Sequence, residues 1–114
     1  MLTLKKSSEF QDVFKTGKWS SSDTLVTYTK KINSEENKVG VAVSKKIGKS
    51  VVRNRLKRLA REAYRKNETK ILAGFNIVIV YKNNINIENL TFDNVEKDLF
   101  KCLKKANLLK ENVD

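Results

Sequence analysis

The most constraining feature of this 114-residue chain is an apolar run at positions 76–81, Asn-Ile-Val-Ile-Val-Tyr. A strand with one face in water alternates polar and apolar residues, whereas this run offers apolar side chains to both faces. It therefore predicts a strand that is covered on both sides. A chain of this length suits one domain, which we expect to occupy residues 1–114 with a frayed tail at 110–114.

Other strands are predicted earlier in the chain. Residues 24–29 are β-branched and aromatic, with Val26 and Tyr28 on one face. Residues 38–45 alternate valines with small residues, and the small-residue face leaves room for a helix or a ligand. A polar turn joins the two segments, so we expect an antiparallel hairpin. Residues 18–19 add a small edge strand.

Three helices are predicted around these strands. The first is short, with Ser8 and Gln11 at capping-box spacing and an aromatic face made by Phe10 and Phe14. The second covers residues 51–66. Its N-cap is Ser50, and its apolar stripe is Val52, Leu56, Leu59, Ala60 and Ala63.

The last predicted helix is capped by Thr91, and Cys102 borders its apolar stripe as a small core residue. The order is therefore helix, two or three strands, helix, strand, helix. Strands that come first, with helices inserted later, indicate an α+β sandwich.

The composition narrows the class of partner. The chain has 24 Lys and Arg against 13 Asp and Glu, a net charge of +11, which favours nucleic acid first and an anionic membrane second; a mere solubility charge is the third reading. One cysteine and no histidine exclude an intrachain disulfide and a Cys/His zinc site. The N-terminus lacks the apolar run of a signal peptide and no stretch is long enough to span a membrane, so we expect a cytoplasmic protein.

The positive charge is concentrated between positions 45 and 66, where ten basic residues face a single acid, Glu62. On a helical wheel the side opposite the apolar stripe holds Arg53, Asn54, Lys57, Arg58, Arg61 and Arg65. Several of the ten basic residues fall at the start of the helix, where the helix dipole disfavours positive charge. Phosphate groups docking there would explain the arrangement. The alternatives are a surface helix without a target and a helix in the DNA major groove, but structured RNA fits better because no helix-turn-helix partner precedes this helix.

A second candidate surface is aromatic. Phe10 and Phe14 of the first helix and Tyr28 of a strand could line a groove for unpaired nucleotides beside Lys15 and Lys18. Spacing alone favours ordinary core packing for these rings. The scattered acids and the absence of histidine argue against a nuclease that works without RNA, so no catalytic residue is predicted on the protein.

Residues 41–62 read Val-Ala-Val-Ser-Lys-Lys-Ile-Gly-Lys-Ser-Val-Val-Arg-Asn-Arg-Leu-Lys-Arg-Leu-Ala-Arg-Glu. This long, ordered run resembles the signature of the bacterial ribonuclease P protein family. The resemblance extends to residues 4–6, to residues 9–17 with their Glu-Phe-Gln-Asp-Val-Phe-Lys-Thr-Gly, to the strand at 25–29 and to the late apolar strand. One departure is Thr3, which stands where an arginine often precedes the first leucine-lysine stretch.

The resemblance implies a two-layer α-β-β-β-α-β-α sandwich with a left-handed crossover, similar to ribosomal proteins, although such crossovers are rare. It implies a catalytic RNA subunit that hydrolyses the 5′ leader from precursor tRNA with Mg²⁺ held mainly by the RNA. Precursor tRNA is the second partner, and no membrane or stable protein partner is expected. A structural RNA-binding protein, such as a ribosomal one, is the competing interpretation.

The resemblance also assigns roles to residues. Together with the cationic face described above, the predicted contacts to the RNA subunit are Lys45, Lys46, Lys49, Arg53, Asn54, Arg55, Lys57, Arg58, Arg61 and Arg65. The predicted contacts to the leader are Phe10, Phe14, Val26 and Tyr28. For these aromatics the resemblance reverses the preference for plain core packing.

Overall fold

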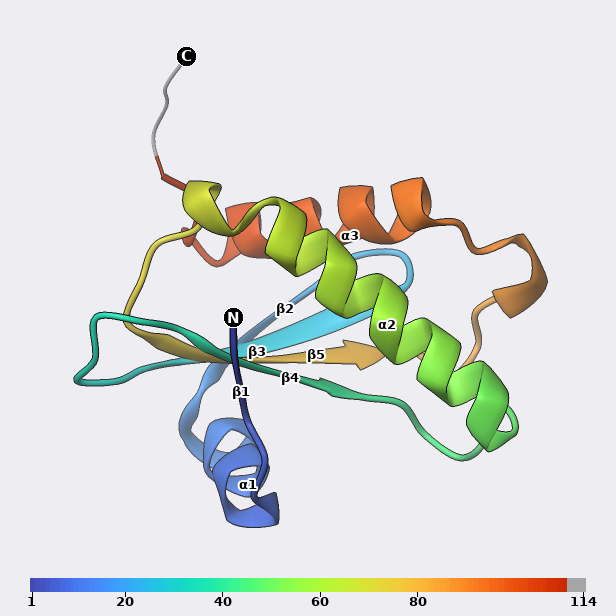
Figure 1. Ribbon diagram of the computed structural model, residues 1–114, viewed down its shortest axis with the longest axis horizontal. Helices are drawn as coiled ribbons and strands as arrows, with labels where there is room; N and C mark the ends of the chain where they lie inside the picture. Colours follow the sequence, from blue (N-terminus) through green and yellow to red (C-terminus); the bar gives the residue numbers. More distant parts are fainter. Residues whose placement is uncertain (111–114) are drawn as a thin grey trace.

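The computed structural model describes residues 1–110, which form one sheet with helices on both faces (Figure 1). In chain order the elements are β1 (Leu2–Thr3), α1 (Ser7–Thr16), β2 (Lys18–Ser21), β3 (Leu25–Lys31), β4 (Lys38–Ala42), α2 (Ser50–Lys66), β5 (Phe75–Tyr81) and α3 (Phe92–Lys105). Short 3₁₀ turns lie at Glu68–Lys70 and Ile87–Asn89. The predicted α+β order is confirmed, and β1 is an added short strand that the sequence did not indicate.

The five strands are ordered β1-β4-β5-β3-β2, so β5 is the central strand. It runs antiparallel to β3 and parallel to β4. The predicted hairpin between residues 24–29 and 38–45 is therefore wrong, because β5 lies between β3 and β4. The physical reason is burial: Ile77, Val78 and Ile79 are each 0% exposed, which a strand with apolar side chains on both faces reaches only inside the sheet. The edge position expected for residues 18–19 is confirmed by β2.

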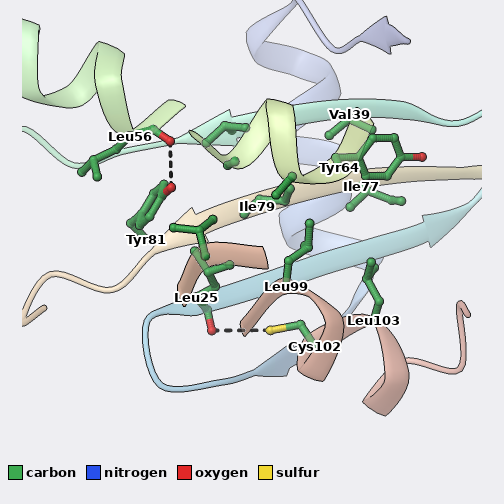
Figure 2. Packing of buried hydrophobic residues seen from close by; sticks show 14 of the residues in the cluster. Leu25, Val39, Leu56, Tyr64, Ile77, Ile79, Tyr81, Leu99, Cys102 and Leu103 are labelled. Carbon is green, nitrogen blue, oxygen red and sulfur yellow. Dashed lines mark hydrogen bonds between the residues drawn. The ribbon is translucent and has the colours of Figure 1, made fainter. Parts of the chain in front are cut away.

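The larger layer of helices consists of α2 and α3, which lie together on one face of the sheet (Figure 1). Their apolar residues form the main core with the sheet, as Figure 2 shows for Leu56 beside Tyr81 and for Leu99 near Ile79. Tyr81 donates its hydroxyl proton to the Leu56 carbonyl at 2.7 Å, which ties β5 to the middle of α2. Cys102 is fully buried in this core, as predicted.

The opposite face of the sheet packs against α1 (Figure 1). A small second core forms there from Leu4, Val13 and Val78. The predicted close approach at the small-residue face of residues 38–45 is confirmed. A Cβ on Gly40 would lie 2.5 Å from the Phe10 ring, so glycine is what leaves room for this ring against the sheet.

The helix caps agree only partly with the sequence. The Ser8–Gln11 capping box is wrong: α1 begins at Ser7, and the Glu9 carboxylate accepts the backbone N–H groups of Lys5 and Lys6 at 3.1 and 3.2 Å. The Ser50 cap is also wrong, because Ser50 is the first residue of α2 and no side chain caps this helix. The Thr91 cap is confirmed, since its hydroxyl accepts the Asn94 N–H at 3.2 Å.

The chain end is tethered as far as it is described. The Lys110 N–H donates to the Lys70 carbonyl at 2.8 Å, and Leu109 forms a bridge with Ile71. Lys110, the first residue of the predicted frayed tail, thus has a backbone partner, and residues 111–114 lie outside the described residues. None of the helices between residues 1 and 110 has the length and apolar character needed to cross a membrane.

Candidate nucleic-acid interface

The cationic surface predicted from the sequence is the outer side of α2 and the loop before it. Leu56, Ala60 and Ala63 are buried beneath the helix, which turns the basic side chains away from the core. The exposed predicted residues are Lys45, Lys46, Lys49, Asn54, Arg55, Arg58, Arg61 and Arg65, and the partly exposed ones are Arg53 and Lys57. We call these ten residues the α2 surface.

No carboxylate neutralises the α2 surface within residues 1–110. The ion pairs in this part of the chain are Lys30–Asp12, Lys38–Glu9 and Lys66–Glu96, and none of them includes a member of the surface. Unpaired cations that lie side by side repel one another, so their proximity raises the free energy of the isolated protein. An anionic partner would relieve this repulsion.

Two arginines of the α2 surface also make contacts inside the protein. Arg53 donates from Nε to the Gly48 carbonyl at 3.2 Å and so fastens the preceding loop to the helix. Arg55 donates from Nη2 to the Leu90 carbonyl at 3.0 Å, next to the start of α3. Sequence reasoning missed these contacts because they join residues of α2 to backbone groups whose positions the fold alone determines.

The start of α2 is the most unusual part of this surface. Its first turn contains no acidic residue and no side-chain cap, whereas α1 has Glu9 and α3 has Thr91 and Asp93 in these places. The first N–H groups of a helix have no partner within the helix, and they bear positive partial charge. Together with the exposed Lys49 at the N-cap position, they form a place where a phosphate group would be stabilised.

The second candidate surface lies on the α1 face of the sheet. Phe10, Phe14, Val26 and Tyr28 all line it, so the structure brings the four predicted residues together. The Phe14 and Tyr28 rings meet edge to face with centroids 4.9 Å apart and an interplanar angle of 87°. We call this surface the aromatic cleft, after the role that the sequence predicts for it.

The aromatic cleft combines core packing with exposure. Phe10 fills the space above Gly40, as a core residue does. Phe14 in contrast keeps 36% of its surface exposed, and Val26 and Tyr28 are half-buried. Core packing is therefore observed for Phe10, while Phe14 and Tyr28 keep surface that a ligand can reach, and the binding of nucleotides there stays a prediction.

Three further residues border the cleft that sequence reasoning did not assign to it. In the strand register, Val26 lies beside Val80, which lies beside Ala42, and Tyr28 lies beside Trp19. Side chains paired across neighbouring strands share a face, so all three are on the α1 side. The places of Val80 and Ala42 depend on β5 being central, which the expected hairpin concealed, whereas Trp19 is placed by the pairing of β2 with β3.

The acids near the cleft are engaged by lysines. Asp12 pairs with Lys30 at 2.6 Å, and Glu9 pairs with Lys38 at 3.4 Å. The backbone N–H groups of Lys6 and Lys5, more than Lys38, lower the pKa of Glu9 below its usual value. Within residues 1–110 no three Cys, Asp or Glu side chains gather in a way that could hold a metal ion.

The fold and these two surfaces define a small basic α+β protein with a cationic helix on one face of its sheet and an aromatic cleft on the other. The model of the ribonuclease P family matches residues 1–107. The chain is 39% identical over 106 residues to the ribonuclease P protein component of Clostridioides difficile strain 630, covering 92% of this chain and 91% of that protein. It is 41% identical over 115 residues to the ribonuclease P protein component of Clostridium perfringens strain SM101, covering 95% of this chain and 90% of that protein. The chain belongs to the family of bacterial ribonuclease P protein components.

Solved structures agree with this assignment. The RNase P protein from Thermotoga maritima superposes with a TM-score of 0.85 at 31% identity, covering 92% of this chain and 97% of that one. The Staphylococcus aureus RNase P protein superposes with a TM-score of 0.83 at 28% identity, covering 96% and 99%. The α+β architecture inferred from the sequence is thus the architecture of this family.

Proposed function

We propose that this protein is the accessory subunit of ribonuclease P, which binds the catalytic RNA and the 5′ leader of precursor tRNA and so promotes removal of the leader. The observation that supports this most is the pairing of two different surfaces on one small sheet. The α2 surface suits a folded polyanion, and the aromatic cleft suits an extended strand of nucleotides. A protein that only bound and stabilised a structural RNA would need the α2 surface but not the aromatic cleft.

The α2 surface is assigned to the RNA subunit. Its arginines project from a helix whose inner side is packed on the core, so the entropy lost on binding is small compared with that of cations on a loop. The planar guanidinium group makes paired hydrogen bonds to phosphate, and the start of α2 adds backbone N–H donors. Such contacts recognise the shape and the phosphates of an RNA rather than the identity of its bases, which suits structured RNA.

The aromatic cleft is assigned to the single-stranded leader. The partly exposed ring of Phe14 and the half-buried ring of Tyr28 can pack against bases of any sequence, because every base offers a π face. Mature tRNA has lost the leader and would not use the cleft. The cleft would therefore favour binding of the precursor over the product and would help product release.

We assign the chemistry to the RNA subunit. The reaction is hydrolysis of one phosphodiester bond, which leaves a 5′ phosphate on the tRNA. Mg²⁺ would be held mainly by RNA phosphates, because the protein carboxylates nearest the cleft, Glu9 and Asp12, already bind lysines. The protein would lower repulsion between the two RNAs and so reduce the Mg²⁺ concentration that the reaction needs. The complex would act in the cytoplasm, without a membrane or a further protein partner.

The decisive experiment compares cleavage of precursor tRNA at low Mg²⁺ by the protein alone, by the RNA subunit alone and by both together. Cleavage only by the combination supports an accessory subunit. Cleavage by protein free of RNA would contradict the proposal. Failure of the protein to help an RNA that is active at high Mg²⁺ would instead favour a structural RNA-binding role, which association with ribosomes would then test.

The leader assignment is tested with Phe14→Ala, and with Phe100→Ala on α3 as the control. Loss of one stacked ring should weaken precursor binding by roughly 1–2 kcal/mol and leave mature tRNA binding unchanged. Phe100 lies away from the cleft, beside Lys70, so its removal should not distinguish the two RNAs. Equal losses for precursor and mature tRNA in the Phe14 variant, with the fold intact, would refute a leader cleft.

A further inference from the structure

A row of side chains crosses the α1 face of the sheet at right angles to the strands. The register places Trp19 of β2 beside Tyr28 of β3, Tyr28 beside Val78 of β5, and Val78 beside Gly40 of β4. Neighbouring strands are about 4.8 Å apart. Trp19 is therefore the outermost member of the row, one strand beyond the aromatic cleft.

Exposure rises steadily along this row. Phe10 covers Gly40, and Val78 is 0% exposed beneath α1. Tyr28 is half-buried, and Trp19 is 68% exposed. The helix thus covers the inner half of the row and leaves the outer half open.

An indole with two thirds of its surface in water is uncommon for a side chain of this size, because tryptophan normally buries most of its area. A scattered apolar residue on a surface needs no explanation, but this one continues an aromatic row into the same face as Phe14 and Tyr28. The row therefore extends the aromatic surface to the edge of the sheet.

The charges around Trp19 indicate what covers it. The strand that holds it, Lys-Trp-Ser-Ser, contains no acid. Lys18 is its exposed neighbour in the sequence, and Lys105 of α3 reaches the Ser21 carbonyl of the same strand at 2.6 Å, so this edge of the sheet is basic. An exposed aromatic ring on a basic edge strand without acids suits a base with its phosphate. A second copy of this chain would bring the same cations together and would be repelled.

We propose that Trp19 stacks on a nucleotide of the precursor leader beyond those held in the aromatic cleft, so that this chain reads a longer stretch of single-stranded RNA than its cleft alone would. This inference rests on the proposed function, since it extends the leader path. It makes Trp19 a positioning residue for leader length and gives it no part in the chemistry.

The chain contains one tryptophan, so its fluorescence reports on this position alone. The experiment uses the protein assembled with its RNA subunit and precursor tRNAs whose leaders grow one nucleotide at a time. Indole emission should stay constant for the shortest leaders and should be quenched once the leader reaches Trp19. Beyond this length, Trp19→Ala should bind precursor about five- to tenfold more weakly than the unaltered protein.

Two control variants sharpen the result. Trp19→Phe keeps a stacking ring and should recover most of the affinity for long leaders. Leu72→Ala removes another exposed apolar side chain, 38% exposed, and should change nothing at any leader length. Mature tRNA should bind all of these variants equally.

The possible results distinguish the role of Trp19 from the proposed binding of the leader, on which that role rests. If the unaltered protein binds precursor and mature tRNA equally, the proposed leader role itself fails. If it prefers long leaders but Trp19→Ala binds them equally well, only the role of Trp19 is refuted. Sedimentation that finds a dimer converted to a monomer by Trp19→Ala would also overturn the proposal, because the indole would then serve an edge-to-edge protein contact.

Discussion

Arg58 offers the cleanest test of the α2 surface. It is exposed on the middle of α2, and its side chain has no hydrogen bond or ion pair to another residue between positions 1 and 110. Removal of its side chain should therefore leave the free energy of unfolding within about 0.5 kcal/mol of the original value. Arg55 differs, because its Nη2 donates to the Leu90 carbonyl at 3.0 Å. Arg55→Ala should thus lower stability as well as affinity.

The magnitude follows from counterion release. One lost phosphate contact reduces the slope of log affinity against log salt by roughly 0.7–0.9. A single charge-assisted contact at an exposed site should be worth about 1 kcal/mol in binding, or about fivefold in affinity. Arg55→Ala should show the same change in slope, with an added loss of up to about 1 kcal/mol in stability from its hydrogen bond to Leu90.

The assay is a titration of the protein into labelled RNA subunit at a series of KCl concentrations. Lys101→Ala is the matched control, because it removes one charge from exposed α3 and leaves the same net charge as Arg58→Ala. The slope should fall for Arg58→Ala and stay constant for Lys101→Ala. If both variants reduce the slope equally, the attraction comes from overall charge and the reasoning about α2 is refuted.

Three further outcomes are expected. Gly40→Ala places a methyl group 2.5 Å from the Phe10 ring, so the ring or α1 must shift; urea unfolding should show a loss of about 1–3 kcal/mol, and discrimination between precursor and mature tRNA should decrease. Burial raises the pKa of both Tyr64 and Tyr81, so the folded state keeps their protons longer than the unfolded chain, and stability should fall as the pH rises above about 10; Tyr81→Phe should weaken this dependence in alkaline unfolding curves. Thr91→Ala removes the cap of α3 and should lower the thermal midpoint through a loss of about 1 kcal/mol, whereas Thr91→Ser should not.

Periodicity predicted the elements of this fold but not the order of its strands. The apolar run in β5 predicted a strand buried on both faces, and the buried side chains of β5 confirm this prediction. The same feature should have warned against a hairpin of β3 and β4, because a doubly covered strand needs a neighbour on each side. Short connections nevertheless favour pairing of consecutive strands, and that local preference is overruled here by burial of β5.

The site was predicted at the level of faces rather than contacts. Because side chains alternate between the two faces of a strand, the sequence placed Val26 and Tyr28 on one face, and the register of β3 confirms this placement. It could not show how deep each ring lies, because depth depends on where α1 settles above Gly40. Trp19 was missed for a different reason: the two residues expected in the edge strand carry too little pattern to show which face the indole shares.

The start of α2 shows most clearly that this chain was not selected for its own stability alone. Both α1 and α3 have an acidic residue in their first turn, whereas α2 has none and begins among lysines. If phosphate takes the place of that acid, an acid introduced there should stabilise the protein and harm the complex. Val51 is the position to change, because it lies in the first turn of α2, is 74% exposed and touches no part of the core.

Val51→Glu should raise the free energy of unfolding by about 0.3–1 kcal/mol through the helix dipole. The same carboxylate would repel RNA phosphate, so affinity for the RNA subunit should fall and the slope against salt should become shallower. Val51→Gln separates charge from helix propensity, since it removes the β-branch without adding a charge. Opposite changes in stability and affinity for glutamate, together with little change in affinity for glutamine, would identify the helix start as a phosphate site. A glutamate variant that is more stable and binds RNA with unchanged affinity and slope would show that the phosphates dock farther along the helix.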